Sequence, residues 1–165
     1  MNSKEVALTG LFGALYAIMV VLLSSISFLP IQIRFADLLL PLSIIFGVPA
    51  IIGISVGTIV SNVIGNLGSV DIIGGTIANL IATTVAWKIG SMKFNGSLII
   101  AVISEIIIVT LIVGTYISSL FNIPIIISLI QIGIGSIIAI GICGTITLLA
   151  VLRSNEIQKK SKGLK

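Results

Sequence analysis

Charged residues are almost absent from the interior of this sequence, and their absence most limits what the chain can fold into. They make up 8% of the 165 residues, whereas hydrophobic residues make up 57%. A soluble domain carries about 25% charged residues, so this chain lacks the polar side chains needed to cover a surface in water. We expect an all-α integral membrane protein with a single transmembrane domain, residues 1–165.

Turn residues divide the apolar sequence and predict a bundle of six transmembrane helices. The second segment is short for a crossing, which takes about 20 residues, but Gly47-Val48-Pro49 favours a break after it. If residues 38–60 formed one continuous span, the bundle would have five. The six predicted spans are residues 6–28, 35–47, 49–64, 72–90, 97–119 and 125–151.

Positive charge gathers in the tail, residues 153–165, which contains Arg153, Lys159, Lys160, Lys162 and Lys165. Lys and Arg collect on the cytoplasmic side of membranes, so we expect the C-terminus to be cytoplasmic and the protein to lie in the cell membrane. With six spans the N-terminus is cytoplasmic too. The count of inner charges is the same for five spans and does not decide between them. Anionic lipid explains the tail better than a nucleic acid does.

Several common chemistries have no counterpart in the sequence. It has no histidine, and its one cysteine, Cys143, lies in an apolar run, so no zinc site is expected. Neither GxxxxGK[ST] nor GxSxG occurs. We therefore expect no enzyme activity, no metal and no cofactor in this chain.

Three of the few internal charges fall close together, at Arg34, Asp37 and Asp71. Arg34 and Asp37 are three residues apart and can pair on one helical turn. Such a pair either anchors the second span at the interface or lines an outward-facing cavity. Asn62 and Asn79 are further candidates, because an amide offers donors and an acceptor to the edge of a planar heterocycle.

Other polar residues in the spans have a structural explanation. Thr58 is expected to bond across helices, and Tyr116, near a span end, to anchor at the interface. Glu105 lies about 12 Å into the fifth span at about 1.5 Å per residue. A charge there costs about 2.5–3.5 kcal/mol, so Glu105 must be protonated, paired or open to a polar cavity. It serves either a ligand or transport role, or a structural hydrogen bond.

The first span carries two pairs of small residues at helical spacing, Gly10-xxx-Ala14 and Gly13-xxx-Ala17. Small residues four apart let a second helix approach closely. They pack either inside this bundle or against a partner subunit.

The central stretch of the chain contains a series of charged, amide, Gly and Pro residues at defined spacing. They are Ile31-Gln32-Ile33-Arg34, Asp37, Pro41, Pro49-Ala50-Ile51-Ile52-Gly53, Gly57, Asn62, Asp71, Gly75 and Ala78-Asn79-Leu80. In this series the chain resembles the queuosine-precursor transporter (QueT-type) family, whose members are substrate-binding S components of energy-coupling-factor (ECF) transporters. The residue type departs from the family pattern at two of these positions, Asp37, where Glu is common, and Asn79, where Thr is more usual.

This resemblance implies six membrane helices and a pocket near the outer face for a deazaguanine base, a precursor of queuosine or archaeosine. It also implies a transmembrane coupling subunit and two ABC ATPases, which use the ATP and dock on the first helix. The docking residues would be Gly10, Ala14 and Ala17. The candidate substrate-binding residues are Arg34, Asp37, Asn62, Asp71, Asn79 and Glu105.

Three alternatives remain open on the sequence. The same kind of S component could carry another vitamin-like compound, such as a pyrimidine or a thiamine-like molecule. A proton-coupled secondary transporter could use Glu105 as its proton site. A purely structural membrane protein would bind none of these ligands.

Overall fold

The computed structural model describes residues 1–27, 33–92 and 94–163, and every regular element in these ranges is a helix. The side chains of residues 25–26 and 155–163 lie outside this description. So do the predictions that fall on residues 28–32, on Lys93 and on the lysines of the tail.

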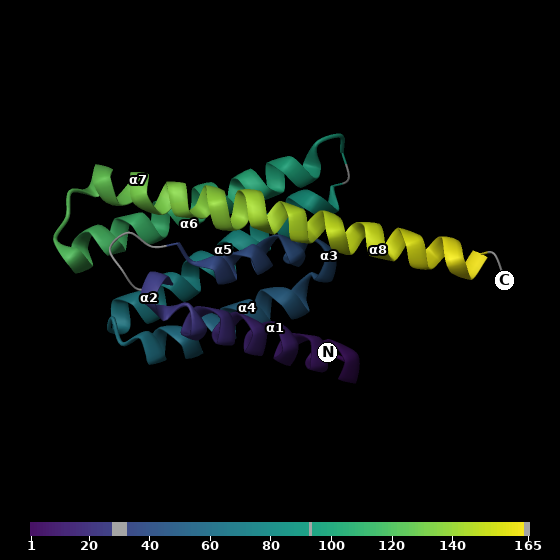
Figure 1. Cartoon of the computed structure of the whole chain (residues 1–165), viewed down its shortest axis with the longest axis horizontal. Helices are drawn as coiled ribbons and strands as arrows, with labels where there is room; N and C mark the ends of the chain where they lie inside the picture. The colour runs from purple at the N-terminus through teal and green to yellow at the C-terminus, as the bar shows by residue number, and fades with distance from the viewer. Residues whose placement is uncertain (28–32, 93, 164–165) are drawn as a thin grey trace.

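The helices follow the apolar segments of the sequence (Figure 1). Five helical segments are long and apolar enough to cross a membrane within the described residues, and the segment Phe35–Phe46 is shorter. The elements are α1 (Ser3–Leu22), α2 (Ser24–Ser27), the 3₁₀-helix η1 (Phe35–Leu42), α3 (Ser43–Phe46), α4 (Val48–Gly65), α5 (Ser69–Ser91), α6 (Ser97–Phe121), α7 (Ile125–Ser136), the π-helix η2 (Ile137–Gly144) and α8 (Thr145–Gly163).

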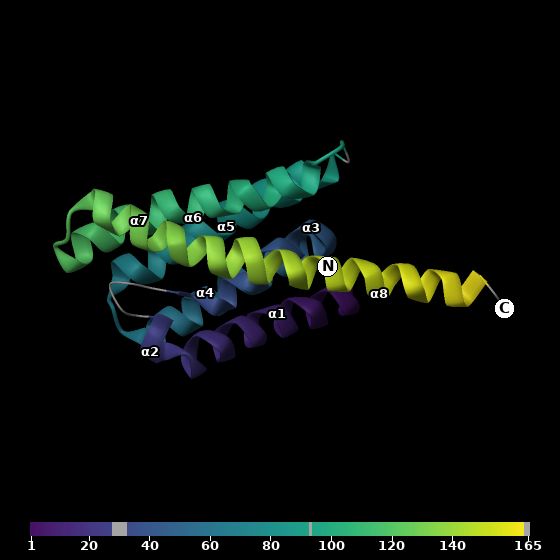
Figure 2. The same ribbon diagram turned by 45° about the horizontal axis from the view of Figure 1, so that its top comes forward.

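The two ends of the chain lie at the same end of the bundle. Figures 1 and 2 show the N-terminus of α1 and the C-terminus of α8 on one side, with α2 and the start of α7 at the other. An even number of passes along the bundle produces this arrangement. The segment η1–α3 therefore acts as one of the passes, although it is shorter than the others.

Helices α1 and α4 pack backbone to backbone. A Cβ atom on Gly53 would lie 2.5 Å from the carbonyl oxygen of Thr9, and one on Gly57 would lie 2.6 Å from that of Gly13. Only glycine fits at these contacts. The Gly53-xxx-Gly57 pair and Gly13 therefore serve packing inside the bundle.

The other small residues of α1 lie on a different side of the helix. Gly10 and Ala14 are exposed and Ala17 is half-buried. These three residues line a groove of about 240 Å³ between α1 and α4. Gly13 also lines this groove, so it takes part both in the contact with α4 and in the outer surface of α1.

The 3₁₀-helix η1 holds the first charged residues of the site. Pro41 lies inside it and has no N–H to donate, which removes one α-helical hydrogen bond. At the start of this segment the Asp37 N–H donates to the Arg34 carbonyl, three residues back, at 2.9 Å. A 3₁₀-helix has three residues per turn, so Arg34 and Asp37 lie on the same side of this segment.

The segment η1–α3 runs through the interior of the bundle. Leu40 is fully buried. The ring of Pro41 packs against Gly144 of η2, where a Cβ atom would lie 2.9 Å from it. Gly47, with φ of 59°, ends α3, and α4 begins at Val48 with Pro49 in its first turn. The chain thus turns at Gly47-Val48-Pro49, where the sequence favours a break. This packing fixes the position of η1 between α1, α5 and η2.

Candidate functional site

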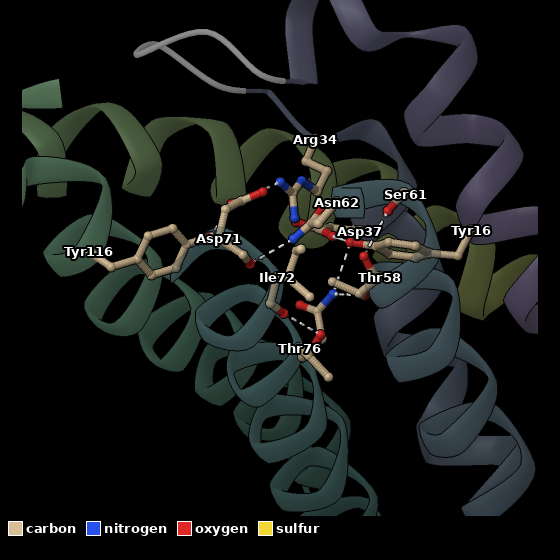
Figure 3. A network of polar contacts seen from close by, with 11 residues as sticks. Tyr16, Arg34, Asp37, Thr58, Ser61, Asn62, Asp71, Ile72, Thr76 and Tyr116 are labelled. Atoms are coloured by element: carbon tan, nitrogen blue, oxygen red, sulfur yellow. Dashed lines mark hydrogen bonds and ion pairs between the residues drawn. The ribbon is translucent and has the colours of Figure 1, made fainter. Parts of the chain in front are cut away.

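Five of the six predicted substrate-binding residues come together inside the bundle, and Figure 3 shows four of them by name around one network of polar contacts. They come from the start of η1, the end of α4 and the first half of α5. All five are buried, with at most 7% of each residue exposed. They are Arg34, Asp37, Asn62, Asp71 and Asn79.

One half of the network is built around Asp71, in the first turn of α5. The Nη2 atom of Arg34 lies 3.9 Å from Asp71 Oδ1. The Tyr116 hydroxyl donates to the same oxygen at 2.9 Å, and Asn62 Nδ2 donates to the Asp71 backbone carbonyl at 2.8 Å. A helix N-terminus favours an acidic side chain, and a buried charge is tolerated when paired and hydrogen-bonded. These contacts tie α4, α5, α6 and η1 together.

The other half of the network is built around Tyr16 of α1, which is fully buried. Its hydroxyl donates to Asp37 Oδ1 at 2.6 Å and accepts from Asn79 Nδ2 at 2.9 Å. Asn79 Nδ2 also donates to Thr58 Oγ1 at 2.8 Å. Tyr16 thereby connects the carboxylate of η1 to the amide of α5. The short bond to Asp37 is typical of a charge-assisted contact.

A small cavity lies beside this network. Its volume is about 20 Å³, which is room for about one water molecule. Its lining is part polar and part apolar, and the apolar side chains come from α6 and α7. The lining residues are Arg34, Asp37, Asn79, Val109, Val113, Ile132, Gly135 and Ser136. In the described state the cavity beside the network is therefore too small for a ligand larger than water.

Glu105 has other contacts. Its side chain is fully buried, and its Oε1 atom lies 3.5 Å from the hydroxyl of Ser43, the first residue of α3. It is not among the residues that line the cavity. The structure thus groups Glu105 with Ser43 rather than with the other five predicted residues.

The polar residues at the site that were not predicted as ligand contacts include Tyr16, Thr58, Tyr116 and Ser136. The spacing of Tyr16 with the buried Phe12 and Val20 marks the inner face of α1 and could have identified it. Tyr116 was expected at the membrane interface, but its hydroxyl turns inward to Asp71. Sequence position alone does not reveal that direction, because both orientations suit a tyrosine near a helix end.

The charged residues at the start of η1 also contact other helices. Arg34 pairs with Asp71 across the bundle, and Asp37 accepts a hydrogen bond from Tyr16. The charges therefore connect helices, which a local interfacial anchor does not do.

Comparison with protein families identifies the family of this chain. The family model described as QueT transporter matches residues 6–153. Comparisons with curated proteins and with solved structures give no match. Because the family model covers most of the sequence, the chain belongs to the QueT transporter family.

Proposed function

We propose that this chain is the substrate-binding S component of an ECF-type ABC transporter and that it captures a deazaguanine base, a precursor of queuosine or archaeosine. Its family is one of transporters, and its several long apolar helices make it a multi-pass membrane protein. ATP hydrolysis would belong to partner ATPases, which act through a transmembrane coupling subunit.

The buried polar network beside a half-apolar cavity is the observation that carries this proposal. A guanine-like ring presents adjacent N–H donors on one edge and a carbonyl acceptor beside them. The Asp37 carboxylate can accept from the donors, while Arg34 or Asn79 can donate to the carbonyl. The apolar side chains of α6 and α7 would cover the faces of the ring. Asn62 and Asp71 would hold Arg34 and the start of α5 in place.

The small size of the cavity means that binding requires a movement of the helices. Ligand pockets usually measure about 300–1,000 Å³, far more than the 20 Å³ found beside Arg34. Helix α7 is attached to α6 by a 2.7 Å hydrogen bond from the Ser128 hydroxyl to the Gly114 carbonyl. We therefore expect the parts of α6 and α7 that this bond joins to move together when the cavity opens.

The groove on α1 supports a partner on that helix. Gly10, Ala14 and Ala17 line it and leave the helix backbone accessible. Close helix packing in membranes uses small residues of this kind. We propose that the coupling subunit docks here, since the internal contacts of α1 are made by other residues.

We propose that the polar network faces the outside of the cell membrane and that both termini are cytoplasmic. The termini lie at one end of the bundle (Figure 1), and the exposed Arg153 lies toward that end on α8. Asp71 at the start of α5 and Asn62 near the end of α4 lie toward the opposite end. Cationic residues favour the cytoplasmic side.

Binding and uptake test different parts of the proposal. Calorimetry on the purified chain should detect one site for deazaguanine bases and much weaker binding of pyrimidines and thiamine. Uptake in cells should require co-expression of the coupling subunit and both ATPases. Tight binding of a pyrimidine instead would overturn the substrate, and full uptake without the ATPases would overturn the S-component role.

A further inference from the structure

The contacts of Glu105 differ from those of the other two buried acids. Asp37 accepts a 2.6 Å hydrogen bond from Tyr16, and Asp71 has both Tyr116 and Arg34 beside it. Among the described residues, Glu105 has one hydrogen-bond partner, the Ser43 hydroxyl, at 3.5 Å. Its second oxygen is buried and has no hydrogen-bond partner among the described residues.

An ionised carboxylate does not suit this position. It offers about four acceptor sites, and here at most one long hydrogen bond reaches them. Within the described residues Glu105 takes part in no ion pair, and the charge that acts on it from η1 is Asp37, which is of like sign. An unpaired buried charge is very costly, and a group so placed becomes neutral instead.

The hydroxyl of Ser43 points to the same conclusion. It lies 3.2 Å from the backbone carbonyl of Thr83 and 3.5 Å from Glu105 Oε1. A serine hydroxyl has one hydrogen, which the shorter distance assigns to Thr83. A protonated Glu105 can then donate its own hydrogen to Ser43 Oγ. All three residues are fully buried and come from α3, α5 and α6.

We propose that Glu105 is a neutral carboxylic acid at neutral pH and that it positions the segment η1–α3 by donating a hydrogen bond to Ser43. Ser43 follows directly on η1, whose first turn carries Arg34 and Asp37 into the cavity. Glu105 is thus a positioning residue that joins α6 to this segment, with no proton passed to the substrate. The protonation state stands on its own, whereas the effect on binding rests on the proposed function.

Infrared spectroscopy of the ligand-free protein reads the protonation state directly. An exposed glutamate is ionised at pH 7, so a carboxylic acid carbonyl band at that pH reports a protonated buried acid. The difference spectrum between wild type and Glu105→Gln should contain this band. Its absence, with a carboxylate band in its place, would overturn the proposal.

Binding and thermal unfolding test the positioning role. Glu105→Gln keeps the shape and a donor, so it should retain wild-type stability and affinity within about twofold. Glu105→Ala should weaken deazaguanine binding by about three- to tenfold, as expected for one lost hydrogen bond. If Glu105→Ala does not fold, Ser43→Ala provides the same comparison.

A Glu105→Gln variant that loses binding and stability as Glu105→Ala does would overturn the role. Should wild type bind no deazaguanine, the infrared band and the unfolding temperatures still decide the question. Failure of the proposed substrate is therefore distinguishable from failure of this inference.

Discussion

Gly75 gives the sharpest steric test of the network, because any side chain there would enter it. A Cβ atom at Gly75 would lie 2.7 Å from Asn62 Nδ2, well inside the 3.4 Å at which ordinary contact begins. It would also lie 3.4 Å from the Tyr116 hydroxyl and 3.6 Å from Arg34 Nη1. In Gly75→Ala, Asn62 has to withdraw and weaken its 2.8 Å bond to the Asp71 carbonyl.

The expected magnitude follows from three opposing effects. Overpacking costs about 1–3 kcal/mol, and the weakened hydrogen bond adds up to about 1 kcal/mol. Alanine is more favourable than glycine in a helix by about 1 kcal/mol, and this gain offsets the loss from the weakened hydrogen bond. We therefore expect a net loss of about 1–3 kcal/mol, which is a 5- to 150-fold weaker affinity if the distorted network binds the substrate.

Gly10→Ala is the matched control for this variant. It makes the same chemical change in a helix, but a Cβ atom there meets nothing within 4 Å. On the purified chains, calorimetry and thermal unfolding should give Gly10→Ala a normal affinity and an equal or higher melting temperature. The affinity and the melting temperature of Gly75→Ala should both be lower than those of wild type. Equal affinities in the two variants would refute the placement of the binding site.

Two further variants separate substrate binding from partner docking. Asp71→Ala removes a carboxylate that pairs with Arg34 and accepts a hydrogen bond from Tyr116. Because breaking a buried pair costs about 3–5 kcal/mol, ligand affinity should fall more than tenfold, while membrane insertion persists. Asp71→Asn keeps the acceptor, so its affinity should lie between those of Asp71→Ala and wild type. An unchanged affinity in Asp71→Ala would exclude Asp71 from the site. Gly10→Leu should fill the groove on α1, so uptake should drop strongly in the presence of the partners while calorimetry gives the wild-type affinity. Normal uptake in that variant would contradict docking on α1.

The membership of the site was largely predictable from the sequence. Polar residues are costly inside a membrane and usually face a bundle interior or a cavity. The interior was therefore the expected location for Arg34, Asp37, Asn62, Asp71 and Asn79. The structure brings these five together. The approximate helix ranges were also predictable, because Gly, Pro and Asn interrupt otherwise apolar runs.

The geometry within the site was not predictable. The 3₁₀ form of η1 depends on how Pro41 packs against η2 as well as on its missing N–H. The depth of Glu105 along α6 followed from the sequence, but depth does not determine which neighbour a side chain contacts, and its neighbour is Ser43. The inward turns of Tyr16 and Tyr116 likewise depend on partners far away in the sequence.

The volume of the cavity also depends on the whole bundle. It is set by side chains from several helices, including Val109, Val113 and Ile132. Helix packing brings them within a water-sized distance of Arg34 and Asp37, and no local pattern encodes that closeness.

Native mass spectrometry of the purified wild-type chain, mixed with deazaguanine bases, pyrimidines and thiamine, tests the binding claim most directly. We expect a single added mass equal to one deazaguanine base, and its loss in an Arg34→Ala, Asp37→Ala double variant that still unfolds cooperatively. An added pyrimidine or thiamine, no added mass at all, or a deazaguanine retained by the double variant would contradict binding at the network of Arg34, Asp37 and Asp71.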